Sequence, residues 1–198
     1  WSDLRKALIS QGYTQCIHDQ CVFHKTEVDG SITYLATWVD DVIIASNSPK
    51  IETLKQTLEN KGFAITTFED LEWYLGLSIS RHKDGSISID QSAYIDQMLS
   101  NFGMKDSHSC TTPIAPGDML PEKVDSPFLD EATPYRSLIG ALSHLGRFTR
   151  PDILFATFYF ARFQKEPTEA HWTGAKRILR YLKGTKKLQI TIPKTKGE

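Results

Sequence analysis

Two adjacent carboxylates, Asp40 and Asp41, are the residues whose types and spacing best fit chemistry. They separate an apolar run that ends at Val39 from one that begins at Val42. An unpaired buried carboxylate is costly, so both side chains must reach water, a cation or a hydrogen-bond donor. Carboxylate oxygens suit Mg²⁺, and a divalent cation would relieve the repulsion between them. An ordinary hairpin turn explains the same pair, and spacing alone favours that simpler explanation.

A second set of candidate residues is cationic and lies near the C-terminus. The net charge of the chain is −1, yet eight basic residues and one acidic residue follow residue 170, and residues 1–170 carry an excess of acids. Lys176, Arg180 and Lys183 recur at steps of four and three, which places them in one stripe of a helix. Such a stripe suggests a polyanionic partner. A solvated lysine-rich helix face is the alternative, and charge alone leaves both open.

The elements that position these residues follow from apolar spacing and turn chemistry. Residues 13–46 read as a small antiparallel meander, with Asp40 and Asp41 at the tip of its last hairpin. A helix is predicted after Ser48, and a second hairpin turns at Asp84-Gly85. The strand-rich first half and the helical second half together predict an α+β fold.

The second half is predicted to be helical around a proline-rich connector. A helix follows Ser92, and the four prolines within residues 104–132 indicate an extended segment. Three helices then begin near Thr133, Thr149 and Thr168. The last of them, about residues 169–183, has an inward apolar stripe formed by Trp172, Ala175, Ile178, Leu179 and Leu182. His171, at the start of this helix, is expected to have a capping and packing role.

Composition excludes several classes of protein. With 40% apolar and 24% charged residues among 198, the chain is globular rather than disordered. No apolar run approaches the roughly 20 residues of a membrane helix, so no membrane partner is expected. Three cysteines exclude a disulfide scaffold and fit a reducing compartment. An amphipathic pattern is already under way at Trp1, so we expect the chain to be a piece of a longer intracellular protein.

Several short motifs occur in a fixed order along nearly the whole chain. They lie at residues 19–23, 38–41, 74–79, 89–94, 112–113, 135–142, 150–153 and 176–185. In this order and spacing they resemble the reverse transcriptase of copia-type retrotransposons, part of a Pol polyprotein. Residues 38–41, Trp-Val-Asp-Asp, resemble the Tyr-Val-Asp-Asp turn of that family, and residues 74–79 resemble its Phe-Leu-Gly-Ile-x-Ile segment.

The resemblance implies part of a right-hand polymerase fold, with an antiparallel palm sheet followed by a helical thumb. Residues 1–91 would be the later part of the palm and residues 92–187 the thumb and connection, with the connector at 104–132. Residues 188–198 would begin a linker toward an absent ribonuclease H domain. The expected partners are the RNA template, the RNA/DNA hybrid and the remainder of the Pol polyprotein, in a cytoplasmic particle or the nucleus.

The resemblance also assigns roles to individual residues. Asp40 and Asp41 would be catalytic and would bind the Mg²⁺, or Mn²⁺, of a two-metal nucleotidyl transfer. The residues expected to contact nucleic acid are Trp38, Tyr74, Leu75 and Gly76, from the resemblance, and Lys176, Arg180 and Lys183, from the basic stripe. The first four would lie near the primer end, with residues 74–76 as the primer grip.

Two departures from the family pattern limit the expected activity. In these polymerases a third carboxylate lies on a strand upstream of the position of Trp1, and the chain contains neither this strand nor the fingers. At the turn, Trp38 replaces the usual tyrosine. We therefore expect an intact parent to be an RNA-directed DNA polymerase and this chain alone to be inactive. The alternatives are a non-catalytic nucleic-acid-binding remnant and a pseudogene product.

Overall fold

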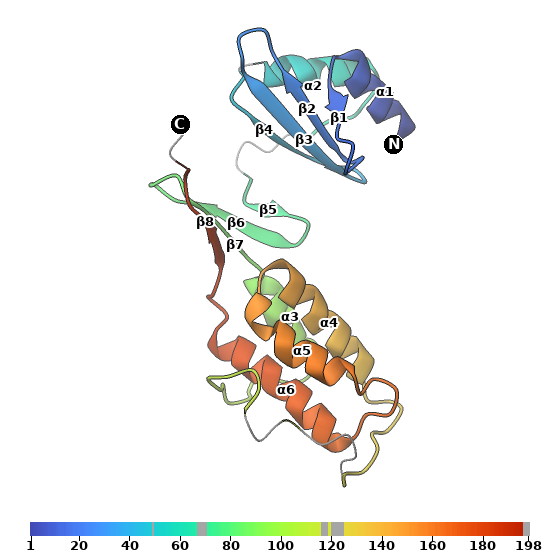
Figure 1. The fold of residues 1–198 in the computed structure, drawn as a ribbon, viewed down its shortest axis with the longest axis vertical. Coiled ribbons are helices and arrows are strands. Elements are labelled where there is room, and N and C mark those ends of the chain that lie inside the picture. Colours follow the sequence, from blue (N-terminus) through green and yellow to red (C-terminus); the bar gives the residue numbers. More distant parts are fainter. Residues whose placement is uncertain (49, 67–70, 116–118, 120–124, 196–198) are drawn as a thin grey trace. The chain divides into compact units, whose positions relative to one another are not determined.

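Residues 1–48, 50–66, 71–115, 119 and 125–195 are described by the computed structural model. The chain divides into two compact units, Trp1–Glu69 and Asp70–Glu198 (Figure 1). Each unit contains one four-stranded antiparallel sheet, and the second unit also contains the helices of the C-terminal half. The predicted α+β class is therefore confirmed.

The first unit is an antiparallel meander with two helices. Its elements are α1 (Ser2–Ser10), β1 (Thr14–Gln15), β2 (Val22–Thr26), β3 (Ile32–Trp38), β4 (Asp41–Ser46) and α2 (Ile51–Asn60). The strands pair in the order β1-β2-β3-β4, which confirms the meander predicted for residues 13–46. Pro49, in the predicted start of the second helix, lies outside the described residues.

Both helices pack on one face of this sheet. Phe23 and Leu35 lie opposite each other on β2 and β3 and are almost fully buried. They form one apolar cluster with Leu8 of α1 and with Leu54 of α2. Because side chains alternate along a strand, the residues between the buried ones point to the other face. That outer face carries Tyr34 and is exposed.

The second unit joins two hairpins to a helical bundle. Its elements are β5 (Trp73–Tyr74), β6 (Leu77–Arg81), β7 (Ile87–Asp90), α3 (Ser92–Asn101), α4 (Tyr135–Phe148), the short 3₁₀ helix η2 (Pro151–Ile153), α5 (Leu154–Ala161), α6 (Glu169–Gly184) and β8 (Ile190–Ile192). The strand order is β5-β6-β7-β8. The predicted hairpin at Asp84-Gly85 is the turn between β6 and β7. Within the segment expected to begin a linker, residues 190–192 form β8, which pairs with β7.

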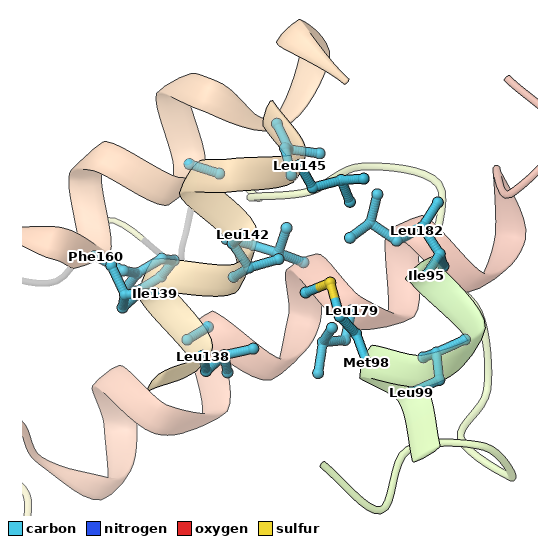
Figure 2. Close-up of a cluster of buried hydrophobic side chains, with 14 of the residues drawn as sticks. Ile95, Met98, Leu99, Leu138, Ile139, Leu142, Leu145, Phe160, Leu179 and Leu182 are labelled. Carbon is cyan, nitrogen blue, oxygen red and sulfur yellow. The ribbon is translucent and has the colours of Figure 1, made fainter. Parts of the chain in front are cut away.

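The helices enclose the larger of the two apolar cores. Leu142 of α4, Phe160 of α5 and Leu179 of α6 are fully buried in one cluster, and Ile95 and Met98 bring α3 into it (Figure 2). Four of the five residues in the predicted stripe of α6 are buried, and Trp172 packs against the same cluster. The predicted helices are confirmed, and the apolar residues whose spacing predicted them are the ones buried in this core.

The start of α6 is fixed by Thr168 and His171. The Thr168 backbone N–H donates to His171 Nδ1 at 3.0 Å, and the His171 backbone N–H donates to the Thr168 hydroxyl. The imidazole also stacks on Phe163, with ring centroids 4.0 Å apart. Burial lowers the pKa of His171, which favours the neutral ring that this acceptor role requires. The predicted capping and packing role is confirmed.

No helix in the described part of the chain is long and apolar enough to cross a membrane.

Candidate functional site

Asp40 and Asp41 lie at the tip of the β3–β4 hairpin. Trp38 pairs with Asp41, so Val39 and Asp40 are the two central residues of a tight turn. The φ angle of Val39 is 53°, a positive value at the first central position, as in a type II′ turn. The hairpin predicted from the polar interruption of two apolar strands is therefore confirmed.

The tip presents both carboxylates to solvent. Asp40 and Asp41 are exposed, and neither carboxylate forms a hydrogen bond or ion pair with the described residues. Asp41 shares the outer face of the sheet with Trp38, whose side chain is 60% exposed. Because hard oxygen ligands with free lone pairs suit Mg²⁺, the two side chains fit a divalent cation.

Two carboxylates supply only part of a metal coordination shell. Within the described ranges, no group of three His, Cys, Asp or Glu side chains converges on one point. Among the strands that the structure describes, β4 is the last of its sheet, and its apolar side chains Val42 and Ile44 remain partly exposed. An edge strand of this kind has unpaired backbone groups available to a further strand.

Residues 74–76 form the second exposed turn. Tyr74 pairs with Leu77, so Leu75 and Gly76 are the central residues of the β5–β6 hairpin. Both have positive φ, 49° and 80°, the pattern of a type I′ turn. Leu75 is 44% exposed and Tyr74 is half-buried. The turn thus holds an apolar side chain in water at its tip.

Backbone strain is concentrated at these two turns. Val39 and Leu75 are the only non-glycine residues with positive φ in the described ranges. A branched or bulky residue in this region is strained by about 1–3 kcal/mol, and such strain clusters at functional sites. Both residues lie in segments that the sequence singled out for function. Neither follows the residue preference of its turn, so a structural role alone does not explain them.

We expect Leu75→Asn to raise the free energy of unfolding by about 1 kcal/mol. Asn tolerates positive φ, and Asn-Gly is a preferred type I′ sequence. Urea denaturation followed by circular dichroism measures the change. The control is Leu188→Asn, which alters an exposed leucine whose φ is not positive and is expected to shift stability by less than about 0.5 kcal/mol. Destabilisation by Leu75→Asn would contradict strain at this turn.

The predicted cationic stripe of α6 is partly engaged within the unit. Lys183 Nζ donates to the backbone carbonyls of Lys105 and Ser107, the latter at 2.7 Å. Arg180 Nε donates to the His108 carbonyl at 2.9 Å. Lys176 Nζ lies 5.4 Å from the centre of the Trp172 ring. These partners are neutral, so the positive charge remains while some hydrogen-bonding capacity is used to hold the segment after α3.

Comparison with known proteins identifies relatives along the whole chain. The family described as reverse transcriptase (RNA-dependent DNA polymerase) matches residues 1–116. The Pol polyprotein of transposon RE1 from Arabidopsis thaliana is 34% identical over 97% of this chain and 13% of its own length. The retrovirus-related Pol polyprotein of transposon TNT 1-94 from Nicotiana tabacum is 32% identical over 89% of this chain and 14% of its own.

A third relative, the Pol polyprotein of transposon RE2 from Arabidopsis thaliana, is 32% identical over 92% of this chain. The chain thus spans about one eighth of the length of these relatives. No solved structure matches it. The family match covers more than half of the chain and includes both strained turns, and the relatives extend the similarity through the helical bundle. The chain belongs to the reverse transcriptase family and is homologous to a segment of copia-type retrotransposon Pol polyproteins.

Proposed function

We propose that this chain supplies part of a reverse transcriptase active site, with Asp40 and Asp41 as metal-binding catalytic residues. The observation that carries the proposal is the hairpin tip, where two unpaired carboxylates follow a strained Val39 in a chain of this family. The first unit would belong to the palm, and the helices of the second to the thumb and connection. The RNA template and the RNA/DNA hybrid would be its partners, in a cytoplasmic particle or the nucleus.

Asp40 and Asp41 would hold the divalent cation through their free carboxylate oxygens. When bound, Mg²⁺ would supply the positive charge that activates the primer 3′-hydroxyl and neutralises the departing pyrophosphate. The contribution of the protein is positioning, because the ladder bonds of β3 and β4 fix the hairpin that carries both side chains. Trp38 and residues 74–76 would hold the primer end.

In isolation the chain is proposed to be inactive. The described residues bring two carboxylates together, whereas polymerases of this family use three. The exposed edge of β4 is the place where a further palm strand from the rest of a Pol polyprotein would pair. The second candidate function is nucleic-acid binding without catalysis. The positively charged helix α6 would support such binding even in a chain that catalyses no reaction.

Terbium luminescence tests the proposed metal site. Trp38 shares a face with Asp41, so its excitation should sensitise Tb³⁺ bound at the tip, and Mg²⁺ should displace the signal. We expect Asp40→Asn with Asp41→Asn to abolish it. The matched control is Asp106→Asn with Glu131→Gln, which removes two exposed carboxylates elsewhere and should leave the signal unchanged. Equal signals from both double variants would exclude a metal site at the tip.

Primer extension tests the proposed inactivity. The isolated chain should incorporate no nucleotide on a primed RNA template with either Mg²⁺ or Mn²⁺. If the chain incorporates nucleotides in a template-dependent way and Asp40→Asn abolishes this, the described carboxylates are sufficient for catalysis. The proposed inactivity of the isolated chain would then be wrong.

A further inference from the structure

The helix pair α4 and α5 exposes large apolar side chains on its outer side. The two helices pack against each other and lie side by side in Figure 1. Phe155 of α5 is 63% exposed and Phe158 is 45% exposed. Because they are three positions apart in a helix, both lie on the same face of α5. An exposed apolar patch with a polar rim is typical of an interaction surface.

Arginine side chains form the rim of this patch. The guanidinium carbon of Arg147, on α4, lies 6.0 Å from the centre of the Phe158 ring. Arg162 is exposed and follows the last residue of α5, four positions after Phe158, so it continues the same stripe. Arg136, at the start of α4, donates from Nε to the Gln164 carbonyl at 3.0 Å, which brings it to the end of α5.

These arginines have no acidic partner nearby. Residues 132–165 contain one acid, Asp152, and its carboxylate accepts hydrogen bonds from the buried Arg150. None of Arg136, Arg147 and Arg162 forms an ion pair with the described residues. The rim of the patch therefore carries a positive charge that the described chain leaves unbalanced.

The α4 side of the patch contains open space. Gly140 lies four positions after Arg136 and seven before Arg147, so all three share one stripe of α4. A Cβ at Gly140 would meet no atom within 4 Å. The surface between the two arginines is thus free to receive an apolar side chain. The α4–α5 face, as named below, comprises Arg136, Gly140, Arg147, Phe155, Phe158 and Arg162.

Charge and apolar content together select the kind of partner. A two-fold contact between copies of this chain would place the same face on both sides and bring its arginines together, which is unfavourable. Surfaces that bind a nucleic-acid duplex are more polar and more strongly charged throughout. An apolar centre with charges at its rim, rich in aromatic side chains and arginine, is the anatomy of a protein–protein interface.

We propose that the α4–α5 face binds an acidic amphipathic helix of a partner protein. Apolar side chains of that helix, spaced three and four positions apart, contact Phe155 and Phe158 and enter the space at Gly140. Carboxylates beside them pair with Arg147 and Arg162. This interaction is separate from the metal site and from the cationic stripe of α6, so it does not depend on the proposed function.

Peptide selection tests the proposed chemistry. A library of randomised helical peptides of about 18 residues, about five helical turns, is displayed on phage and selected on the full chain. Peptides that also bind the double variant Phe155→Ser with Phe158→Ser are removed. The remaining peptides should combine helically spaced apolar residues with flanking Asp and Glu. Recovery of no such peptide, or of peptides without an excess of acids, would overturn the proposal.

The affinity of one selected peptide locates the contact. Fluorescence anisotropy of the labelled peptide gives its dissociation constant. Phe155→Ser with Phe158→Ser should weaken binding at least about tenfold, because a few large side chains at the centre of an interface carry most of its affinity. The matched control is Phe128→Ser with Leu188→Ser, which changes two exposed apolar side chains elsewhere in the unit and should leave affinity within about twofold.

A charge exchange tests the arginine rim. Arg147→Glu with Arg162→Glu should weaken the acidic peptide at least about tenfold, because like charges then face each other. The same peptide with Lys in place of each acid should bind this variant more tightly than it binds the wild type. If the variant and the wild type bind both peptides equally, the arginines do not recognise the partner and the proposal is wrong.

Two further probes distinguish other classes of partner. An RNA/DNA hybrid and vesicles of phosphatidylcholine with phosphatidylserine are compared on the wild type and on Phe155→Ser with Phe158→Ser. Both should bind the two proteins equally. Loss of hybrid binding in the double variant would assign the α4–α5 face to nucleic acid, and loss of vesicle binding would assign it to a membrane surface. Either result would overturn the proposal, provided that circular dichroism shows a folded variant.

Discussion

Asp152→Ala is expected to lower the free energy of unfolding by about 3 kcal/mol. The guanidinium of Arg150 is 2% exposed and donates to both Asp152 oxygens, at 2.9 and 2.7 Å. Its remaining bonds go to the carbonyl and hydroxyl of Thr185, at the end of α6. Removing the carboxylate leaves a buried charge uncompensated, which costs roughly 3–5 kcal/mol. We expect the lower end because the Asp152 side chain is 33% exposed.

The matched control is Asp96→Ala, which breaks an ion pair of similar length. Lys186 Nζ lies 2.9 Å from Asp96, but both side chains are well exposed. Exposed pairs contribute about 0–1 kcal/mol, so this variant should lose less than about 1 kcal/mol. Urea denaturation followed by circular dichroism compares the two. Equal losses would mean that burial of Arg150 does not determine the strength of its pair.

The same pair should make stability depend on pH. Burial by itself would raise the pKa of Asp152, but hydrogen bonds from Arg150 and Tyr181 and the charge of Arg150 outweigh it and lower the pKa. The carboxylate therefore binds protons more weakly when folded. Its stabilisation is complete above the ordinary value of 3.8 and is lost as the pH falls from there through the folded-state pKa. Asp152→Ala should lack this component of the acid transition.

Gly174→Ala should lower the free energy of unfolding by about 1–3 kcal/mol. A Cβ at this position of α6 would overlap the ring of Phe160, with Cε1 at 2.5 Å. Phe160 is fully buried, so its ring cannot move aside without disturbing the core, and overpacking costs about this much. Thermal and urea denaturation measure the loss.

Gly140→Ala is the matched control because Gly140 lies inside α4 with open space at its Cβ position. Alanine in a helix is favoured over glycine by about 1 kcal/mol, so this variant should be neutral or stabilised. Combining Gly174→Ala with Phe160→Leu should cost less than the sum of the single changes, because the smaller side chain makes room. Simple additivity would show that the two residues do not share the strain.

Local chemistry in the sequence was enough to predict the hairpins and helices. Asp84-Gly85 indicated a turn because that pair tolerates its backbone angles, and the apolar stripe of α6 indicated a helix with one buried face. The same reasoning placed Asp40 and Asp41 at a hairpin tip. These features depend on residues a few positions apart, so the sequence alone determined them. The roles of the two carboxylates came only from the resemblance and remain a proposal.

Contacts between distant residues were decided by the tertiary structure. Arg150 is charged and follows Thr149, near which a helix was predicted to begin, yet its side chain is buried because Asp152 and Thr185 accept its hydrogen bonds. Lys183 stays a proposed nucleic-acid contact, and the fold adds donation from its Nζ to carbonyls 76 and 78 positions earlier. Likewise residues 190–192 form β8, which pairs with residues 87–89 of β7 far away in the sequence. The free energy of such contacts depends on which partners the folded chain brings together, and spacing along the sequence does not contain that information.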